Sequence, residues 1–358
     1  MKKPLELLIL DTGQDVQAVA YARYNNNSAV EIIQCNAIPA LNEFRIRLNQ
    51  VATGEAASPP TKEELSIFGK NLFNFAFNKK VLDVYRRLPN ETIKIQVISN
   101  RPDFQSLPWE YLQDPMANIG PNRSRGIVRI VPTIGNEIPE IRKLKNKLRL
   151  LFVYADPTDQ AYVAWEDIQN TIEREFLGRL EQGTFEMKVI EGSSIEQLNE
   201  ALISNSYDIL HFNGHGSIIM QGVDKGTGIL VFRDRVTGES QEVPASKLAM
   251  ILSGRNLQLV VLSACNSSAG DFSKSYAVVA QALVESGIPA VVANQFAVTN
   301  SIAATFSSGL YRGLLATGDI DEAVAEGRQV LALADHTTLE WGIPTLYRHV
   351  DASKLFEV

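Results

Sequence analysis

The sequence predicts an α/β fold built on a mostly parallel sheet. Short apolar segments alternate along the chain with segments of helical periodicity, which is typical of βαβ units. The apolar runs that lead to His215 and Cys265 lack the polar alternation of a strand with one face in water, so they are expected to be buried on both faces. The chain has 358 residues, more than one core usually holds, and two packed lobes are therefore expected.

The first lobe is predicted to span residues 1–145. Its opening apolar run, interrupted by Glu6 and Asp11, is interpreted as a strand rather than a signal peptide. Thr61, followed by Glu64 three residues later, is a capping-box pattern and marks the start of one long helix over about residues 62–87. The predicted strands of this lobe cover residues 5–10, 30–34, 93–99 and 127–131.

The second lobe is predicted to span residues 146–358 and to hold the chemistry. Besides the strands that lead to His215 and Cys265, strands are expected at residues 148–155, 185–191, 229–232 and 290–293. Helices are expected at residues 166–181, 195–203, 273–285, 302–315 and 319–334, the second of them capped by Ser193 or Ser194. The charge-free stretch at residues 286–311 contains too many polar residues for a membrane span.

Composition limits the classes of partner. The formal charge is -7, from 34 basic and 41 acidic residues, which disfavours nucleic acid as a direct ligand. No membrane partner is expected. The chain has two cysteines far apart in sequence, so no disulfide framework is expected, and the cytoplasm is the expected location.

His215 and Cys265 are the candidate catalytic residues. Parallel strands present their carboxyl ends at one edge of the sheet, where open α/β sheets bind ligands, and an imidazole beside a thiol makes a cysteine nucleophile. His215 lies between Gly214 and Gly216, and Cys265 precedes a small, polar turn that leaves the thiol accessible. The alternatives from position alone are a loop histidine and a buried core cysteine.

The remaining candidates are interpreted as structural. His211, inside its strand, is expected in the core or supporting the site, and Cys35, His336 and His349 have no matching motif. The stretches Gly214-His-Gly216 and Gly226-Thr-Gly228 do not fit a phosphate-binding pattern, and His211 and His215 do not have the spacing of a zinc site. No cofactor and no metal are expected.

The ordered set of motifs resembles the CHAT family of caspase-like cysteine peptidases. His-Gly after one strand and Ser-Ala-Cys after another carry the resemblance, and coverage is dense from about residue 94 onward. The further matching stretches are Leu107-Pro-Trp-Glu-Tyr-Leu112, residues 150–157, residues 287–296, Asp321-Glu-Ala-Val-Ala-Glu-Gly-Arg328 and residues 341–347.

This resemblance implies the caspase and separase fold, a three-layer α/β/α sandwich with a mostly parallel sheet, preceded by a degenerate pseudo-protease lobe. It implies an endopeptidase in which Cys265 is the nucleophile, His215 the general acid/base, and the N–H groups of Gly216 and Cys265 the oxyanion hole. The implied substrate is a specific protein, for example a pore-forming effector in bacterial defence or cell death. A separate activating or sensor protein is expected, and residues 218–227 are the expected mobile loop.

Two departures from the family pattern bear on specificity. Several relatives carry an aspartate where this chain has Ser263, and many carry an acidic residue where it has Asn300. An uncharged, aliphatic P1 residue is therefore expected, with Asp224, Arg233, Asp234 and Asp271 as further charges whose place the spacing does not decide. The alternatives to a peptidase are a non-catalytic CHAT-fold interaction module and a hydrolase of small amides.

Overall fold

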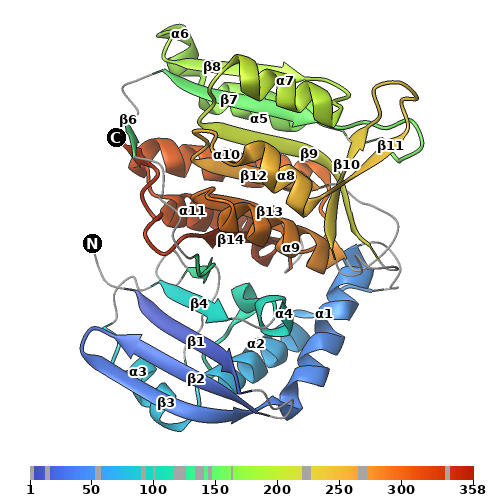
Figure 1. Cartoon of the computed structure of the whole chain (residues 1–358). Helices are drawn as coiled ribbons and strands as arrows, with labels where there is room; N and C mark the ends of the chain where they lie inside the picture. The colour runs from blue at the N-terminus through green and yellow to red at the C-terminus, as the bar shows by residue number, and fades with distance from the viewer. Residues whose placement is uncertain are drawn as a thin grey trace.

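The computed structural model describes residues 4–12, 17–52, 58–89, 94–99, 102–116, 126–133, 141–143, 147–162, 164–219, 227–264, 272–334 and 339–358. Their main feature is a single sheet of thirteen strands that runs through the whole molecule (Figure 1). We call residues 4–133 the N-terminal part and residues 147–358 the C-terminal part. The sheet confirms the predicted α/β class.

The C-terminal part holds a parallel block in the order β8-β7-β9-β12-β13. Its inner strands are buried on both faces, and β7 has only one residue that is not buried, whereas the edge strand β8 is partly exposed. The antiparallel strand β14 and the ribbon β10-β11 complete this part. The strands are β7 (Leu148–Tyr154), β8 (Phe185–Ile190), β9 (Ile209–Ile218), β10 (Gly228–Arg233), β11 (Ser240–Pro244), β12 (Leu259–Ala264), β13 (Ala290–Asn294) and β14 (Pro344–Arg348).

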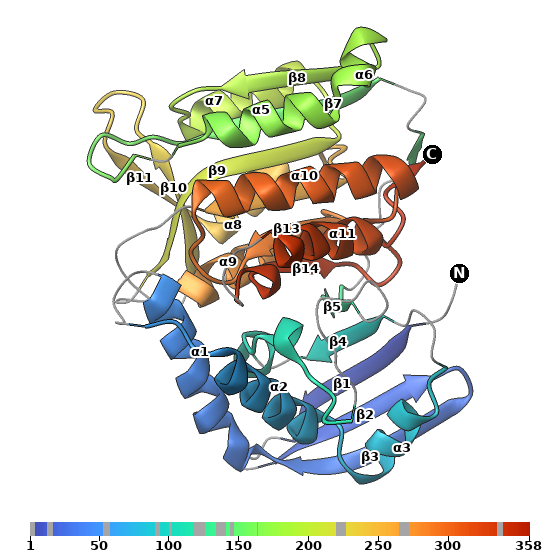
Figure 2. The same cartoon turned by 180° about the vertical axis from the view of Figure 1, so that it is seen from behind.

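Helices cover both faces of this block, as a three-layer sandwich requires (Figures 1 and 2). One layer is α7 (Ile195–Ser204), α8 (Ala245–Leu252) and α9 (Phe272–Glu285). The other layer is α5 (Glu166–Glu175), α10 (Asn300–Thr317) and α11 (Ile320–Leu333), with the short α6 (Leu177–Glu181) at its edge. Each layer closes its own apolar core, so the sheet separates two cores.

The N-terminal part continues the same sheet through β5, which pairs in parallel with β14. Its strand order from there is β5-β4-β1-β2-β3, and β3 forms the edge. The strands are β1 (Leu5–Asp11), β2 (Gln17–Tyr24), β3 (Asn27–Gln34), β4 (Ile95–Ser99) and β5 (Ile127–Ile130), and the helices are α1 (Ile38–Ala52), α2 (Lys62–Ala76), α3 (Lys79–Arg86) and α4 (Pro102–Gln105). The predicted division at residues 145 and 146 stays a prediction. Beside the main sheet, β6 (Arg142–Lys143) pairs with β15 (Phe356–Glu357) near the C-terminus.

Two predicted long helices are each two helices. The helix at residues 62–87 begins at the predicted Thr61 capping box but ends at Phe77, because the rings of Phe73, Phe77 and Tyr85 pack with centroids 4.7 to 4.9 Å apart and turn α3 back. The helix at residues 166–181 breaks at Phe176, whose ring stacks on Phe185 with centroids 4.0 Å apart. Ser194, rather than Ser193, caps α7.

The pattern missed β2, β11, β14, α1 and α8. In β2 the buried face is made of Ala18, Ala20 and Ala22, and alanine gives little strand signal. Within the described residues, no helix is long and apolar enough to cross a membrane.

Candidate active site

The strand β9 changes partner at the candidate histidine. Residues 209–214 pair in parallel with β12, and Ala264 of β12 lies opposite Gly214. From His215 onward β9 pairs antiparallel with β10, and His215 lies opposite Val231. The prediction that the strand ends at His215 is therefore wrong: the strand continues to Ile218, and His215 lies at the point where the two pairings meet.

His215 is buried, with 1% of its surface exposed, and one hydrogen bond holds its ring. Nε2 lies 2.8 Å from the carbonyl oxygen of Ala161. Because a carbonyl oxygen only accepts, Nε2 carries the proton, and Nδ1 carries the lone pair. Within the described residues, Nδ1 has no hydrogen-bond partner. This nitrogen is therefore the one available for proton transfer to or from a reacting group.

The electrostatic environment keeps His215 neutral near pH 7. Burial lowers the pKa of His215 below its ordinary value of 6.5, while the Ala161 carbonyl and the carboxylates of Asp156 and Asp159 act in the opposite direction. A neutral imidazole with a free nitrogen can accept a proton, and the two carboxylates stabilise the charged form once it appears.

Gly216 is required by the packing on the other face of β9. A Cβ atom at this position would lie 2.5 Å from the ring of Tyr276, which α9 presses against the strand. At Gly214 a Cβ atom would lie 2.8 Å from the ring of Phe212. Both glycines around His215 therefore serve close packing as well as the backbone freedom that the sequence suggested.

Cys265 lies outside the described residues. The last described residue of its strand is Ala264, and the register with Gly214 is the information that the fold supplies about this end of β12. Asp224, Asp271 and His336 also lie outside the described residues, as does most of the predicted mobile loop at residues 218–227.

His211 precedes His215 by four residues, on the same face of β9, and is completely buried. Its Nδ1 lies 2.7 Å from the hydroxyl of Tyr311, and its Nε2 lies 2.9 Å from the hydroxyl of Ser263. Burial lowers the pKa of His211 to about 3, so the ring is neutral. The sequence-based interpretation of His211 as a core or supporting residue agrees with this position. No signal in the sequence pointed to Tyr311 as its partner.

The other charges singled out from the sequence, Arg233 at the end of β10 and Asp234 just after it, make local or structural contacts. Asp234 accepts hydrogen bonds from the N–H groups of Val236 and Thr237, and Arg233 donates to the carbonyl of Asp156. His349 accepts from the N–H of Asp351, and Cys35 is buried in the N-terminal part. Among the described residues, no group of three or more His, Cys, Asp or Glu side chains could hold a metal ion.

A cavity of about 510 Å³ is lined by residues of both the N-terminal and the C-terminal parts. We call it the junction cavity. Ala161, the partner of His215, lines it, and so does Asn300. Its other lining residues are mainly apolar and come from five segments: Leu48, Val51, Tyr111, Tyr162, Phe296, Ala297, Val298, Thr299, Ile302, Leu339, Glu340 and Ile343.

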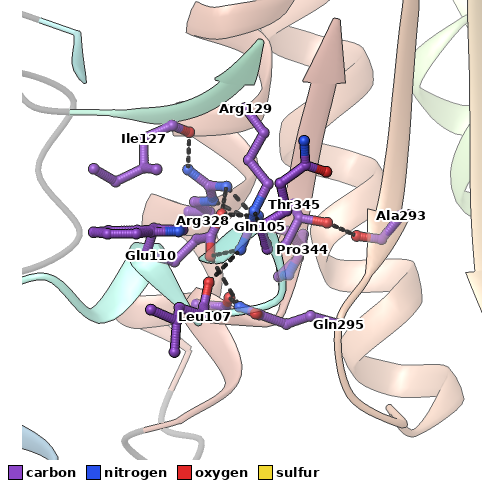
Figure 3. Close-up of polar contacts among 12 residues, drawn as sticks. Gln105, Leu107, Glu110, Ile127, Arg129, Ala293, Gln295, Arg328, Pro344 and Thr345 are labelled. Carbon is purple, nitrogen blue, oxygen red and sulfur yellow. Dashed lines mark hydrogen bonds and ion pairs between the residues drawn. The ribbon is translucent and has the colours of Figure 1, made fainter. Parts of the chain in front are cut away.

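Several motifs of the sequence meet in one buried ionic cluster beside this cavity (Figure 3). Glu110 accepts two hydrogen bonds from Arg129, at 2.5 and 2.8 Å, and a third from Arg328 at 3.3 Å. Gln295 donates to the same carboxylate at 3.0 Å. We call these four residues the Glu110 cluster. All four are buried. The three charged side chains can stay buried because each pairs with an opposite charge, which offsets the free-energy cost of removing it from water.

Similar solved structures share the fold. The yeast (Saccharomyces cerevisiae) separase in its complex with securin matches with 12% identity and a TM-score of 0.55, over 97% of this chain and 30% of that one. The Arg-specific cysteine proteinase gingipain R (RgpB), of Porphyromonas gingivalis, matches with 13% identity and a TM-score of 0.52, over 98% of this chain and 78% of that one. The chain thus spans less than a third of the separase chain.

At these identities the likeness shows the fold alone, and it is the fold of caspase-like cysteine peptidases. No curated protein matches the chain. A family model described as CHAT domain matches residues 69–350, a range that contains His215 and the whole Glu110 cluster. The chain therefore belongs to the CHAT domain family.

Proposed function

We propose that this chain is a cysteine endopeptidase in which His215 and Cys265 form the catalytic dyad. The observation that carries the proposal is the register between β9 and β12. Ala264 pairs with Gly214, so the residue that follows each of them in sequence is a member of the proposed dyad. Nδ1 of a neutral His215, which has no hydrogen-bond partner among the described residues, supports the same assignment.

The proposed reaction has two steps, formation of an acyl-enzyme on Cys265 and its hydrolysis, and His215 transfers protons in both. The Cys265 sulfur attacks the carbonyl carbon of the scissile peptide, and the N–H groups of Gly216 and Cys265 are the proposed donors to the oxyanion. Nδ1 of His215 takes the proton of the Cys265 thiol as the sulfur attacks, and passes it to the leaving amine as the C–N bond breaks and a thioester remains. Water then adds to the thioester, losing a proton to His215, and His215 returns this proton to the sulfur as the Cys265–acyl bond breaks, which releases the acid and restores the thiol.

The hydrogen bond to Ala161 fixes the plane of the imidazole during both proton transfers. Because a protonated His215 lies near Asp156 and Asp159, the transient imidazolium is stabilised without an ion pair in the ground state.

The proposed substrate is a protein cleaved after an uncharged residue. Ser263 stands where several relatives carry an aspartate, and its hydroxyl faces the neutral ring of His211 rather than a free charge. A basic P1 side chain would find no carboxylate from this residue. We further propose a cytoplasmic protease of bacterial defence or cell death, with a pore-forming effector as one substrate and a separate protein as its activator.

The test is cleavage of a diverse peptide library by the purified chain, with Cys265→Ala and His215→Ala as inactive variants. Cys35→Ala is the matched control, since it removes the other cysteine, buried in the N-terminal part. Cleavage by the wild type and by Cys35→Ala only is the expected result, and the library identifies the P1 residue.

Cleavage only after Arg, Lys or Asp would reject the uncharged P1. If the wild type cleaves no peptide, the assay is repeated with candidate activators. In a second experiment, Cys265 is alkylated in the presence of a binding partner. Partner binding that survives alkylation, without cleavage, would favour the non-catalytic interaction module.

A further inference from the structure

Two segments of the C-terminal part line the junction cavity, and we call them its first and second walls. The first wall follows β13 and includes Phe296, Val298 and Thr299. The second wall precedes β14 and includes Leu339 and Ile343. Both are contacted by the short helix η2 (Trp109–Tyr111), which belongs to the N-terminal part.

Glu110 of η2 holds the first wall. Its carboxylate accepts from the side-chain nitrogen of Gln295, the residue before Phe296 (Figure 3). The same nitrogen donates to the carbonyl of Gly342 at 2.5 Å, and the N–H of Gln295 donates to the carbonyl of Ile343 at 2.9 Å. Arg129 and Arg328 hold the Glu110 carboxylate in place, and this carboxylate in turn holds Gln295 and the wall that follows it.

Tyr111, the next residue, holds the second wall. Its hydroxyl donates to the carbonyl of Leu339 at 2.5 Å, and its ring packs edge-on against Trp341 with centroids 5.2 Å apart. A Cβ atom at Gly342 would lie 2.4 Å from the Tyr111 ring, so the contact leaves no spare room. Burial raises the pKa of Tyr111 well above its ordinary value, which keeps the hydroxyl a donor.

We propose that Glu110 and Tyr111 are positioning residues that set the width of the junction cavity, and that the cavity binds an apolar side chain of the peptide substrate. The proposal rests on the proposed peptidase function. The apolar class follows from the lining, in which Glu340 is the one ionisable carboxylate among the described lining residues. Leu48 and Val51 of α1 extend the same surface, so the N-terminal part contributes directly to substrate binding.

A second buried ionic group joins the same two parts without touching the cavity. Arg348 pairs with Asp321 through hydrogen bonds of 2.7 and 2.9 Å, and Lys94 lies 3.4 Å from Asp321. Asp321 and Arg328 are seven residues apart on α11, about two helical turns. Lys94 therefore gives a control for the general effect of weakening the junction.

The test compares Tyr111→Phe and Gln295→Leu with Lys94→Met. Tyr111→Phe removes the polar contact of Tyr111 to the second wall, whereas Gln295→Leu removes the contacts of the first wall to Glu110 and to Gly342; each retains the bulk of the side chain. For peptides with a large apolar residue near the scissile bond, we expect each to raise KM about five- to tenfold, the equivalent of one or two hydrogen bonds, with kcat within about twofold. Lys94→Met is expected to leave both constants unchanged.

Two readouts do not require catalysis. Amide hydrogen exchange is expected to accelerate at residues 339–343 in Tyr111→Phe, at residues 295–299 and at residues 342 and 343 in Gln295→Leu, and at neither wall in Lys94→Met. In NMR titrations of Cys265→Ala, N-acetyl-leucinamide is expected to shift the resonances of Val51, Phe296 and Leu339, and N-acetyl-lysinamide is not.

These arms separate the two proposals. Absence of cleavage by the wild type both alone and with candidate activators, with the shifts and exchange changes present, would overturn the peptidase and leave the apolar site standing. Cleavage with unchanged KM in both wall variants, equal effects in Lys94→Met, or shifts by the lysine probe alone would overturn the inference.

Discussion

His211 and His215 lie on the same strand and the same face, both are buried, and they are in opposite chemical situations. His211 has a hydroxyl group at each ring nitrogen, from Tyr311 and from Ser263. His215 has the Ala161 carbonyl at one nitrogen and no described partner at the other. Burial lowers the pKa of both rings, but carboxylates oppose the shift only at His215.

The comparison teaches that burial of an imidazole does not define its role. A ring with both nitrogens occupied stabilises the core and stays neutral, because protonation would leave a charge in the interior without a counterion. A ring with one free nitrogen near Asp156 and Asp159 has a lower cost of protonation, as an acid/base requires.

The largest expected difference is in turnover. His215→Gln should lower kcat/KM by at least about 100-fold, because general acid–base catalysis contributes about 10² to 10⁴. His211→Gln keeps an amide that can contact Ser263 or Tyr311, and should lower kcat/KM less than about tenfold. Steady-state kinetics on the best library peptide measure both. Equal losses would mean that the two rings act as a unit and that the distinction is wrong.

Stability should show the reverse order. His211→Ala removes a buried ring and leaves the hydroxyls of Ser263 and Tyr311 without their partner, so the free energy of unfolding should fall by about 3 kcal/mol. His215→Ala breaks one hydrogen bond and should cost less. Urea denaturation at constant pH gives both values, and a larger loss in His215→Ala would contradict the assignment of His211 to the core.

The acid side of the stability curve should depend on His211. Its pKa is about 3 in the folded chain and about 6.5 when unfolded, so the unfolded state binds the extra proton between these values. Stability therefore falls as pH decreases from about 6.5 towards 3, by about 1.4 kcal/mol per pH unit from this group. Denaturation at pH 6 and pH 5 should give a shallower slope for His211→Phe than for wild type. Equal slopes in wild type and His211→Phe would mean that a group other than His211 causes the loss of stability.

The smallest expected effect separates the two partners of His211. Tyr311→Phe removes one hydroxyl from the completely buried ring of His211 and should lower the free energy of unfolding by about 1 kcal/mol, with kcat/KM unchanged within twofold. Ser263→Ala removes the other hydroxyl at a similar cost, but it lies two residues before Cys265 and is expected to change the P1 profile as well. A changed P1 profile in Tyr311→Phe would show that His211 transmits its effect to the site.

Much of the fold was readable because its signals are local. The buried strands, the Thr61 cap and the helices of the C-terminal part depend on residues within a few positions of one another. The breaks at Phe77 and Phe176 were not predicted, since ring packing with distant residues overrides a continuous helical pattern there. The strand β2 was missed because its buried face is alanine.

The sequence by itself determined the family, the class of fold and the identity of the candidate dyad, because each is written in short motifs and strand endings. Only the tertiary structure decided which nitrogen of His215 is free, which hydroxyls enclose His211, and why the Pro-Trp-Glu and Gly-Arg motifs occur together. Glu110 meets Gln295 and Arg328 across 185 and 218 residues of chain. Contacts at such separations leave no periodicity or spacing in the sequence, since they are fixed by how the two parts of the sheet pack together.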